Sequence, residues 1–238
     1  MILHTKVLGE GEPIIFLHTG LQTGETDFVY QQEYFQKGYK VILPDLRAHG
    51  KSKIEQIDIH SYFEDTANDL YETMLHLHIQ QAHIVGCSLG ALVGLLFAKR
   101  FPEFVTSLSL SGIIPQKPSN WDELRQADMI MQYGILENDD AMQYFDSIHQ
   151  LDWKDFLTKS FEQDWYPFHE TGSIEELQCR TLLIVGEAKG HEVQGATFYP
   201  EQNEKVHIAV IPFAGHLVHS EQAELYTNIL ELFFNERS

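Results

Sequence analysis

Short apolar runs alternate along this chain with longer amphipathic stretches. Strands that alternate with helices are typical of a mostly parallel sheet with helices on both faces. The pattern therefore predicts an α/β fold. The apolar runs that have the length and composition of buried strands are 3–8, 14–17, 39–43, 82–85, 105–110, 181–185 and 206–211.

Three stretches have the pattern of helices that cover such a sheet: one from about residue 61, one at 91–100 and a last one from about residue 220. The first begins with Ser61 and Glu64, which have the spacing of a capping box. Its predicted apolar face consists of Phe63, Ala67, Leu70, Met74 and Leu77.

The alternation stops between residues 113 and 177, which hold no clear strand and several short helical patterns rich in aromatic residues and methionine. We expect a helical cap inserted at 113–177 into a core formed by 1–112 and 178–238. Aromatic residues beneath such a cap are suited to line an apolar substrate pocket, although packing of the cap onto the core is the commoner role for any one of them. The candidates are Trp121, Met129, Met131, Tyr133, Tyr144, Phe145, Trp153, Phe156, Trp165 and Tyr166.

The composition is ordinary for a globular protein, with 238 residues, 43% hydrophobic and 21% charged. That length suits one large domain, with or without an insertion. No stretch approaches the roughly 18 to 20 apolar residues of a membrane helix, and residues 1–10 lack the features of a secretion signal. A cytoplasmic location is the expectation.

The chain is strongly acidic, with a formal net charge of -19. Such a charge repels nucleic acid phosphates and anionic membranes, so neither is an expected partner. The two cysteines, Cys87 and Cys179, give no disulfide framework, and Cys87 is predicted to be a small buried packing residue.

The segment Gly86–Gly90, with the sequence GCSLG, lies between the predicted strand 82–85 and the predicted helix 91–100. This is the setting of a nucleophile elbow, in which a sharp turn exposes the hydroxyl of Ser88. Glycine fits the flanking positions because side chains would collide with backbone there and because glycine tolerates positive φ. The unpaired N–H groups of the helix's first turn are available to an oxyanion.

A serine hydroxyl needs a base within hydrogen-bond reach, almost always a histidine. Among 13 histidines, His216 stands apart because it follows the predicted strand 206–211 after a short loop. In a parallel sheet such loops meet at one edge, where the elbow also lies. His216 is therefore the predicted general base for Ser88.

Four segments in order resemble the α/β-hydrolase superfamily over nearly the whole chain. Residues 15–20, IFLHTG, resemble its strand and His-Gly oxyanion loop, and 44–52, PDLRAHGKS, are similar to its D-x-R-G-x-G-x-S segment. GCSLG resembles the nucleophile elbow, and 214–216, AGH, resembles the histidine loop.

The resemblance implies Ser88 as nucleophile and His216 as general base. It also implies that the oxyanion hole consists of the backbone N–H groups of Leu89 and of a residue after His18, with Gly20 favoured. Thr19 departs from the family's glycine at its position.

The resemblance places three further polar residues, Asp45, Arg47 and His49, in the loop after the strand 39–43. We expect them to brace this loop and not to take part in the chemistry.

The third member of the triad departs from the family. An aspartate is common at the fourth residue of the segment 186–189, where this chain has Lys189. Glu192 is the first candidate for a substitute acid and Glu187 the second; the family's other acid position falls near 111–112, which hold no carboxylate. A Ser-His dyad, a water-linked site and a protein without catalysis remain open.

The hypothesis that follows is a cofactor-independent serine hydrolase that cleaves small apolar carboxylic esters through an acyl-enzyme. Amide, thioester and C–C bond cleavage are alternatives, and no metal or nucleotide motif is evident. The competing hypothesis is a non-catalytic ligand-binding or regulatory protein that kept this fold while its acid was replaced by Lys189. The sequence does not decide the substrate or the oligomeric state.

Overall fold

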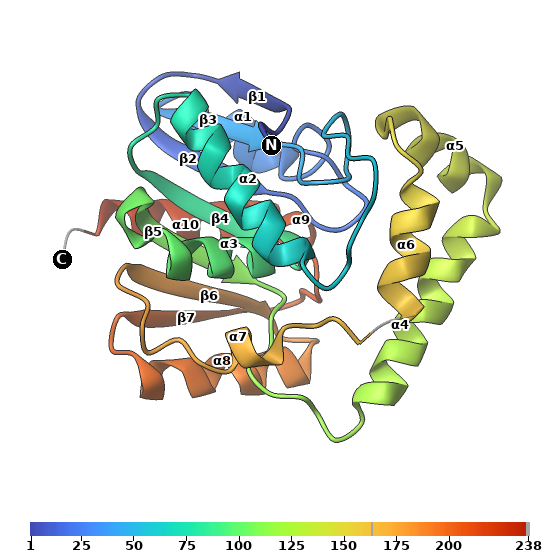
Figure 1. The fold of residues 1–238 in the computed structure, drawn as a ribbon. Coiled ribbons are helices and arrows are strands. Elements are labelled where there is room, and N and C mark those ends of the chain that lie inside the picture. The colour runs from blue at the N-terminus through green and yellow to red at the C-terminus, as the bar shows by residue number, and fades with distance from the viewer. Residues whose placement is uncertain (163, 237–238) are drawn as a thin grey trace.

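The computed structural model describes residues 1–162 and 164–236, and its centre is a seven-stranded sheet in the order β1-β3-β2-β4-β5-β6-β7 (Figure 1). β1 pairs antiparallel with β3, and all other pairs are parallel. The predicted α/β fold is confirmed. The strands are β1 Thr5–Leu8, β2 Glu12–Leu17, β3 Tyr39–Pro44, β4 Ala82–Cys87, β5 Val105–Ser111, β6 Arg180–Gly186 and β7 Val206–Ile211.

Alternate residues of the central strands build two separate cores, one on each face of the sheet. In β2, Ile15 and Leu17 belong to one hydrophobic cluster, while Ile14 and Phe16 belong to the other. Helices α2, α3 and α8 cover the first face, and α1 and α10 cover the second. The helices of this part are α1 Val29–Phe35, α2 Tyr62–His76, α3 Leu89–Arg100, α8 Gly190–Gln202, α9 Val218–Glu221 and α10 Ala223–Asn235, with a short 3-10 helix at Pro102–Phe104.

Segment 113–177 contains four helices among its described residues, and none of those residues forms a strand. Helices α4, α5 and α6 stand to one side of the sheet, and the chain returns to it through α7 (Figure 1). Trp153 and Leu157 form a small cluster of their own with Leu21, which comes from the loop after β2. The helices are α4 Trp121–Leu136, α5 Asp139–Ile148, α6 Trp153–Glu162 and α7 Phe168–Thr171.

The aromatic and methionine residues of this segment divide into two groups. Trp153 and Phe156 are buried, so they pack helices together, whereas Met131 and Tyr144 are 65% and 44% exposed. Packing is thus the observed role for part of the set, and the lining of a pocket by the others stays a prediction.

Two details of the predicted elements are wrong. β1 begins at Thr5 and not at residue 3, because buried Leu3 leaves the strand ladder and its N–H donates to Thr73 Oγ1 of α2 at 2.9 Å. Ser61 does precede α2, but its hydroxyl donates to the Asp65 carboxylate at 3.0 Å and makes no capping bond to the backbone. The predicted apolar face of α2 is buried at four of its five positions, and Leu77 is partly buried.

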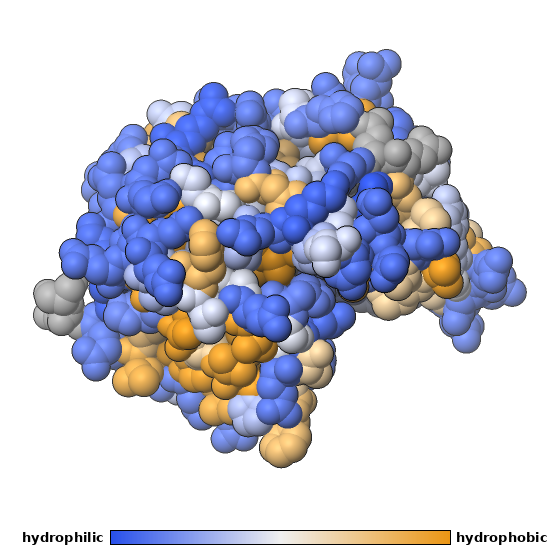
Figure 2. Space-filling view, turned by 90° about the horizontal axis from the view of Figure 1, so that it is seen from below, coloured by the Kyte–Doolittle hydropathy of each residue, from blue (hydrophilic) through white to orange (hydrophobic). Residues whose placement is uncertain are grey.

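The surface is dominated by polar and charged side chains. The face in Figure 2 is mostly hydrophilic and has one gathering of apolar side chains. On the edge strand β7, Ile208 and Val210 are exposed. No helix in the described part of the chain is long and apolar enough to cross a membrane.

Candidate active site

Ser88 lies at the turn between β4 and α3, as the elbow motif predicts. Its backbone has φ 54 and ψ -116, a region that costs a non-glycine residue about 1 to 3 kcal/mol. The turn is held by hydrogen bonds on both sides: Ser88 N–H donates to Ser111 O at 2.8 Å, and Ser88 O accepts from Ala91 N–H at 3.0 Å. The chain therefore keeps one strained residue at the point where strand becomes helix.

The two glycines of the motif are needed for close approach and not for positive φ. A Cβ on Gly86 would overlap the Gly90 carbonyl, and a Cβ on Gly90 would overlap the Leu17 carbonyl of β2. Neither glycine has positive φ; the residue that does is Ser88 itself. The prediction that side chains at these positions would collide with backbone is confirmed. The prediction that the glycines adopt positive φ is wrong.

The loop that carries His216 is fixed by β6 and by its own downstream helix. Gly186, at the end of β6, leaves room for the Ala214 and Gly215 carbonyls, which any side chain there would overlap. Glu221 of α9 accepts the N–H of Gly215 at 2.7 Å. The loop is therefore held at both ends, and His216 projects from a rigid support.

Contacts on two sides place His216 beside the elbow. Cys87 Sγ, next to Ser88 in sequence, donates to His216 O at 3.8 Å. A Cβ on Gly112 would lie 2.6 Å from His216 Cε1, and Gly112 follows Ser111, the residue that accepts the Ser88 N–H. The structure thus brings together the two segments that the sequence singled out.

Cys87 itself is fully buried, and burial raises the pKa of its thiol well above the ordinary value. A neutral buried thiol is a poor nucleophile. The prediction that Cys87 is a packing residue is consistent with this environment.

Glu192 supplies the carboxylate that the sequence left open. His216 Nδ1 and Glu192 Oε1 are 2.7 Å apart. An ionised carboxylate only accepts, so Nδ1 carries the proton and Nε2 is left as the basic nitrogen. Glu192 is 3% exposed and sits in the first turn of α8, where the helix dipole favours negative charge.

Lys189, at the family's usual acid position, is the N-cap residue of α8. The acid therefore comes three residues later, and the extra methylene of glutamate extends its reach. Glu187 has another role: its Oε1 accepts the Phe213 N–H at 3.0 Å. Of the two predicted carboxylates, Glu192 lies against His216 and Glu187 braces the histidine loop.

The loop after β2 is organised by a neutral histidine. The Thr19 carbonyl accepts from His18 Nδ1–H at 2.8 Å, and His18 Nε2 accepts the Leu46 N–H at 2.8 Å. These two backbone partners fix one neutral tautomer. Burial lowers the pKa of His18, which agrees with that state.

The two predicted oxyanion donors, Gly20 and Leu89, lie on different elements. Thr19 N–H donates to Asp27 Oδ2 at 2.8 Å, so it is already engaged. Gly20 is the next residue, and a Cβ built on it would meet nothing within 4 Å. Leu89 is the first residue of α3, a position whose N–H has no partner within the helix.

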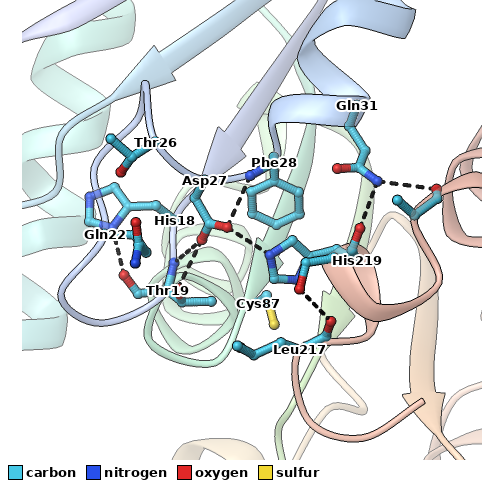
Figure 3. Close-up of polar contacts among 12 residues, drawn as sticks. His18, Thr19, Gln22, Thr26, Asp27, Phe28, Gln31, Cys87, Leu217 and His219 are labelled. Atoms are coloured by element: carbon cyan, nitrogen blue, oxygen red, sulfur yellow. Dashed lines mark hydrogen bonds and ion pairs between the residues drawn. The ribbon is translucent and has the colours of Figure 1, made fainter. Parts of the chain in front are cut away.

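A second histidine–carboxylate pair, which the sequence did not indicate, lies behind this loop (Figure 3). His219 Nε2 and Asp27 Oδ1 are 2.7 Å apart, and Asp27 also accepts the Thr19 hydroxyl at 2.9 Å and the Phe28 N–H at 3.0 Å. Burial would raise the pKa of Asp27, but the bonds from His219 and Thr19 hold it well below its usual range. Thr19 is the residue that could have indicated this pair. The family has a glycine at its position, and glycine has no hydroxyl to donate to Asp27.

The loop after β3 is braced as the sequence predicts. Asp45 accepts the N–H groups of Gly24 at 3.0 Å and Lys51 at 2.9 Å, while Arg47 Nε donates to Asp69 at 2.7 Å. Buried His49 donates from Nδ1 to the Arg47 carbonyl at 2.9 Å. Within residues 1–162 and 164–236, no group of three or more His, Cys, Asp or Glu is arranged to hold a metal ion.

Known proteins resemble this chain in sequence and in fold. Strigolactone esterase D14 of Arabidopsis thaliana is 31% identical over 116 residues, which are 48% of this chain and 43% of that protein's length. Serine hydrolase BPHL of Mus musculus is 25% identical over 250 residues, covering 97% of this chain and 82% of that protein.

Among solved structures, NosK from Streptomyces actuosus superposes with a TM-score of 0.79 at 24% identity, covering 94% of this chain and 98% of that one. The family described as alpha/beta hydrolase fold matches residues 12–178, which is more than half of the sequence. The chain therefore belongs to the alpha/beta hydrolase fold family.

Proposed function

We propose that this chain is a serine hydrolase that cleaves small carboxylic esters through an acyl-enzyme, without a cofactor. The observation that carries the proposal is the 2.7 Å contact between His216 and the buried carboxylate of Glu192, beside the strained turn of Ser88. Membership in the family supports it, as do relatives named as an esterase and a serine hydrolase.

In the first step His216 Nε2 takes the proton of the Ser88 hydroxyl while Oγ attacks the ester carbonyl. The oxyanion that forms accepts the N–H groups of Leu89 and Gly20. Glu192 holds the imidazole in one tautomer and stabilises its positive charge. When the tetrahedral intermediate collapses, the proton passes from His216 to the leaving alkoxide, and the acyl group stays on Ser88.

In the second step water replaces the alcohol. His216 takes a proton from water as the water oxygen attacks the acyl carbon, and the same two N–H groups bind the new oxyanion. Collapse returns the proton to Ser88 Oγ and releases the carboxylic acid. Apart from the ester and one water molecule, both steps need only groups of this chain.

We further propose that segment 113–177 acts as a cap that bounds an apolar substrate site over a core formed by 1–112 and 178–238. Helices α4 to α6, which lie beside the sheet, support this division. A cytoplasmic location and the absence of nucleic acid and membrane partners stay predictions.

The test is turnover of p-nitrophenyl esters with acyl chains of two to eight carbons by the wild type and by Ser88→Ala. We expect saturable turnover by the wild type, and a kcat about 10⁴-fold lower or undetectable for the variant. Ser173→Ala, at an exposed site in segment 113–177, is the matched control and keeps wild-type activity. A wild type that cleaves none of these esters, or a Ser88→Ala variant that cleaves them normally, would overturn the proposal.

The non-catalytic alternative was motivated by Lys189 at the family's acid position. The contact between Glu192 and His216 supports the hydrolase proposal over this alternative. If the wild type binds ester analogues but turns over no ester, and Ser88→Ala keeps the affinity, the binding-protein hypothesis takes precedence.

A further inference from the structure

His149 connects segment 113–177 to the two loops beside the candidate active site. It follows α5 directly and is 7% exposed. Its Nε2–H donates to the Leu21 carbonyl at 2.8 Å, and its Nδ1 accepts the Gly50 N–H at 2.9 Å. Both ring nitrogens are thus used by backbone groups of the core, and the bond in which Nδ1 accepts the Gly50 N–H requires the neutral ring.

Leu21, the residue that His149 holds, is also held through its side chain. The side chain is 7% exposed and packs with Trp153 and Leu157 of α6 in the small cluster of segment 113–177. Its backbone has φ 63, which is unfavourable for leucine. A non-glycine residue keeps such an angle only where its surroundings impose it.

Gly20 lies between two anchored residues. Thr19, before it, is fixed by Asp27 through both its N–H and its hydroxyl. Leu21, after it, is fixed by His149 and by α6. The direction of the Gly20 N–H therefore depends on the core on one side and on segment 113–177 on the other.

A second bond strengthens the same junction. The N–H of Gln150 donates to the Gly50 carbonyl at 2.8 Å, so residues 149 and 150 pair with both backbone groups of Gly50. The only other polar contact between α5 and the loop after β2 among the described residues is a long one, from Tyr144 OH to Gln22 Oε1 at 3.4 Å. His149 is consequently the main polar link.

We propose that His149 is a positioning residue for the oxyanion hole, which couples the placement of segment 113–177 to the direction of the Gly20 N–H. The inference rests on the proposed function, because it assumes that this N–H binds the oxyanion. Its consequence is that the helical segment contributes to the rate of the chemical step and not only to substrate binding.

Several titratable groups face His149. The ring centroids of His49 and His149 are 5.7 Å apart, and those of His18 and His49 are 5.1 Å apart. The negative charge of Asp45, in the loop after β3, also acts on His149. Burial lowers the pKa of His149, while the bond to Leu21 and the charge of Asp45 oppose that effect. Protonation would place an N–H against the Gly50 N–H, so acid should release the junction.

The test compares kcat, KM and the inhibition constant of phenylboronic acid for the wild type, His149→Phe and His149→Gln. Phenylboronic acid binds Ser88 as a tetrahedral adduct whose oxygen occupies the oxyanion hole. For His149→Phe, which fills the site without hydrogen bonds, we expect kcat to fall about 100-fold with KM changed less than about threefold. The inhibition constant should rise by about the same factor as kcat falls.

His149→Gln keeps a donor within reach of Leu21 O and should recover most of the loss in kcat. Ser147→Ala is the matched control, since it removes an exposed hydroxyl of the same helix α5 that donates to a carbonyl within that helix, and it should keep wild-type kcat. If His149→Phe fails to fold, Leu21→Ala tests the same link from the other side, with kcat expected to fall at least tenfold.

The inference and the proposed function fail differently. A wild type without esterase activity defeats the proposed function. An active wild type whose kcat and phenylboronic acid affinity stay within about threefold in folded His149→Phe, or in Leu21→Ala, defeats the inference alone.

Discussion

The histidines of two histidine–carboxylate pairs are three residues apart in sequence, His216 in the loop after β7 and His219 in α9, and the two pairs have the same separation and different surroundings. His216 and Glu192 are 2.7 Å apart, and so are His219 and Asp27. Both carboxylates are largely buried, but the side chain of His216 is 35% exposed and that of His219 only 1%. The two pairs therefore differ in the surroundings of the second ring nitrogen of each histidine.

A short contact between a histidine and a carboxylate therefore shows that the two side chains are paired, but it does not show what the pair does. His219 Nδ1 is buried and has no hydrogen-bond partner in the described part of the chain, and the His219 carbonyl accepts from Gln31 of α1 at 2.9 Å. This pair ties the loop after β2 to α9 and α1. The side chain of His216 is partly exposed, and we propose that its second nitrogen takes the proton of the Ser88 hydroxyl.

The largest expected effect separates the two histidines. His216→Gln should lower kcat for a short p-nitrophenyl ester by about 10⁵-fold and leave the melting temperature nearly unchanged, because the base is lost from a partly exposed site. His219→Gln should lower the melting temperature and keep activity within about tenfold. Steady-state kinetics and thermal unfolding measure both, and the reverse assignment of effects would contradict the comparison.

The next largest effect is expected for the two glutamates that follow β6, Glu187 and Glu192. Glu192→Gln should lower kcat about 10³-fold, since a neutral amide neither stabilises the imidazolium nor enforces its tautomer. Glu187→Gln is the matched control and should stay within about threefold, because the Glu187 carboxylate accepts the Phe213 N–H and makes no bond to His216 in the described part of the chain. Equal losses in both variants would mean that the contact with His216 has no special role.

The buried pair should matter most for stability. Asp27→Asn leaves His219, Thr19 and Phe28 with a weaker acceptor in a buried site, and we expect unfolding to require about 3 kcal/mol less. Thr19→Val removes one donor to the same carboxylate and should cost about 1 kcal/mol. Urea unfolding measures both, and an Asp27→Asn variant as stable as the wild type would exclude the structural role.

The smallest effect is a dependence of stability on pH. Burial lowers the pKa of His18, His49 and His149 in the folded chain, whereas the unfolded values lie near 6.5. Below pH 6.5 the unfolded chain binds protons that the folded chain does not, so stability falls as the pH drops. The carboxyl group of Asp27 also has a lowered pKa. Its contribution to the free energy of unfolding is therefore lost only when the pH falls below the range in which aspartates usually titrate.

We therefore expect the free energy of unfolding to decrease by about 1 to 3 kcal/mol between pH 7 and pH 5. His49→Phe should make this slope shallower, because one of the three histidines no longer titrates. A free energy of unfolding that is constant or rises over this interval would contradict the assignment of neutral buried histidines.

Most of the sheet could be predicted because its central strands are buried on both faces. β4, for example, is buried at every residue, and such runs stand out in sequence without tertiary information. The start of β1 could not be predicted, since Leu3 is as apolar as a strand residue but is bound by Thr73, 70 residues away. Local pattern does not distinguish burial in a ladder from burial against a helix.

The candidate site likewise contains residues that the sequence singles out and residues that only the structure brings together. Ser88 and His216 lie in short motifs at the ends of strands, so sequence alone identifies them. The pairing of Glu192 with His216 depends on the length of the β6 loop and on where α8 begins. Asp27, His149 and His219 belong to no local motif, because Asp27 and His219 are 192 residues apart and His149 bonds to Leu21 across 128 residues.

The proposed function requires an activated Ser88, and reaction with a fluorophosphonate probe measures that activation. The wild type, Ser88→Ala and Glu192→Gln would be labelled in parallel, and the modified peptide identified by mass spectrometry. We predict one adduct on Ser88 in the wild type, none in Ser88→Ala and much slower labelling in Glu192→Gln. A folded wild type that stays unlabelled at Ser88 would contradict the central claim.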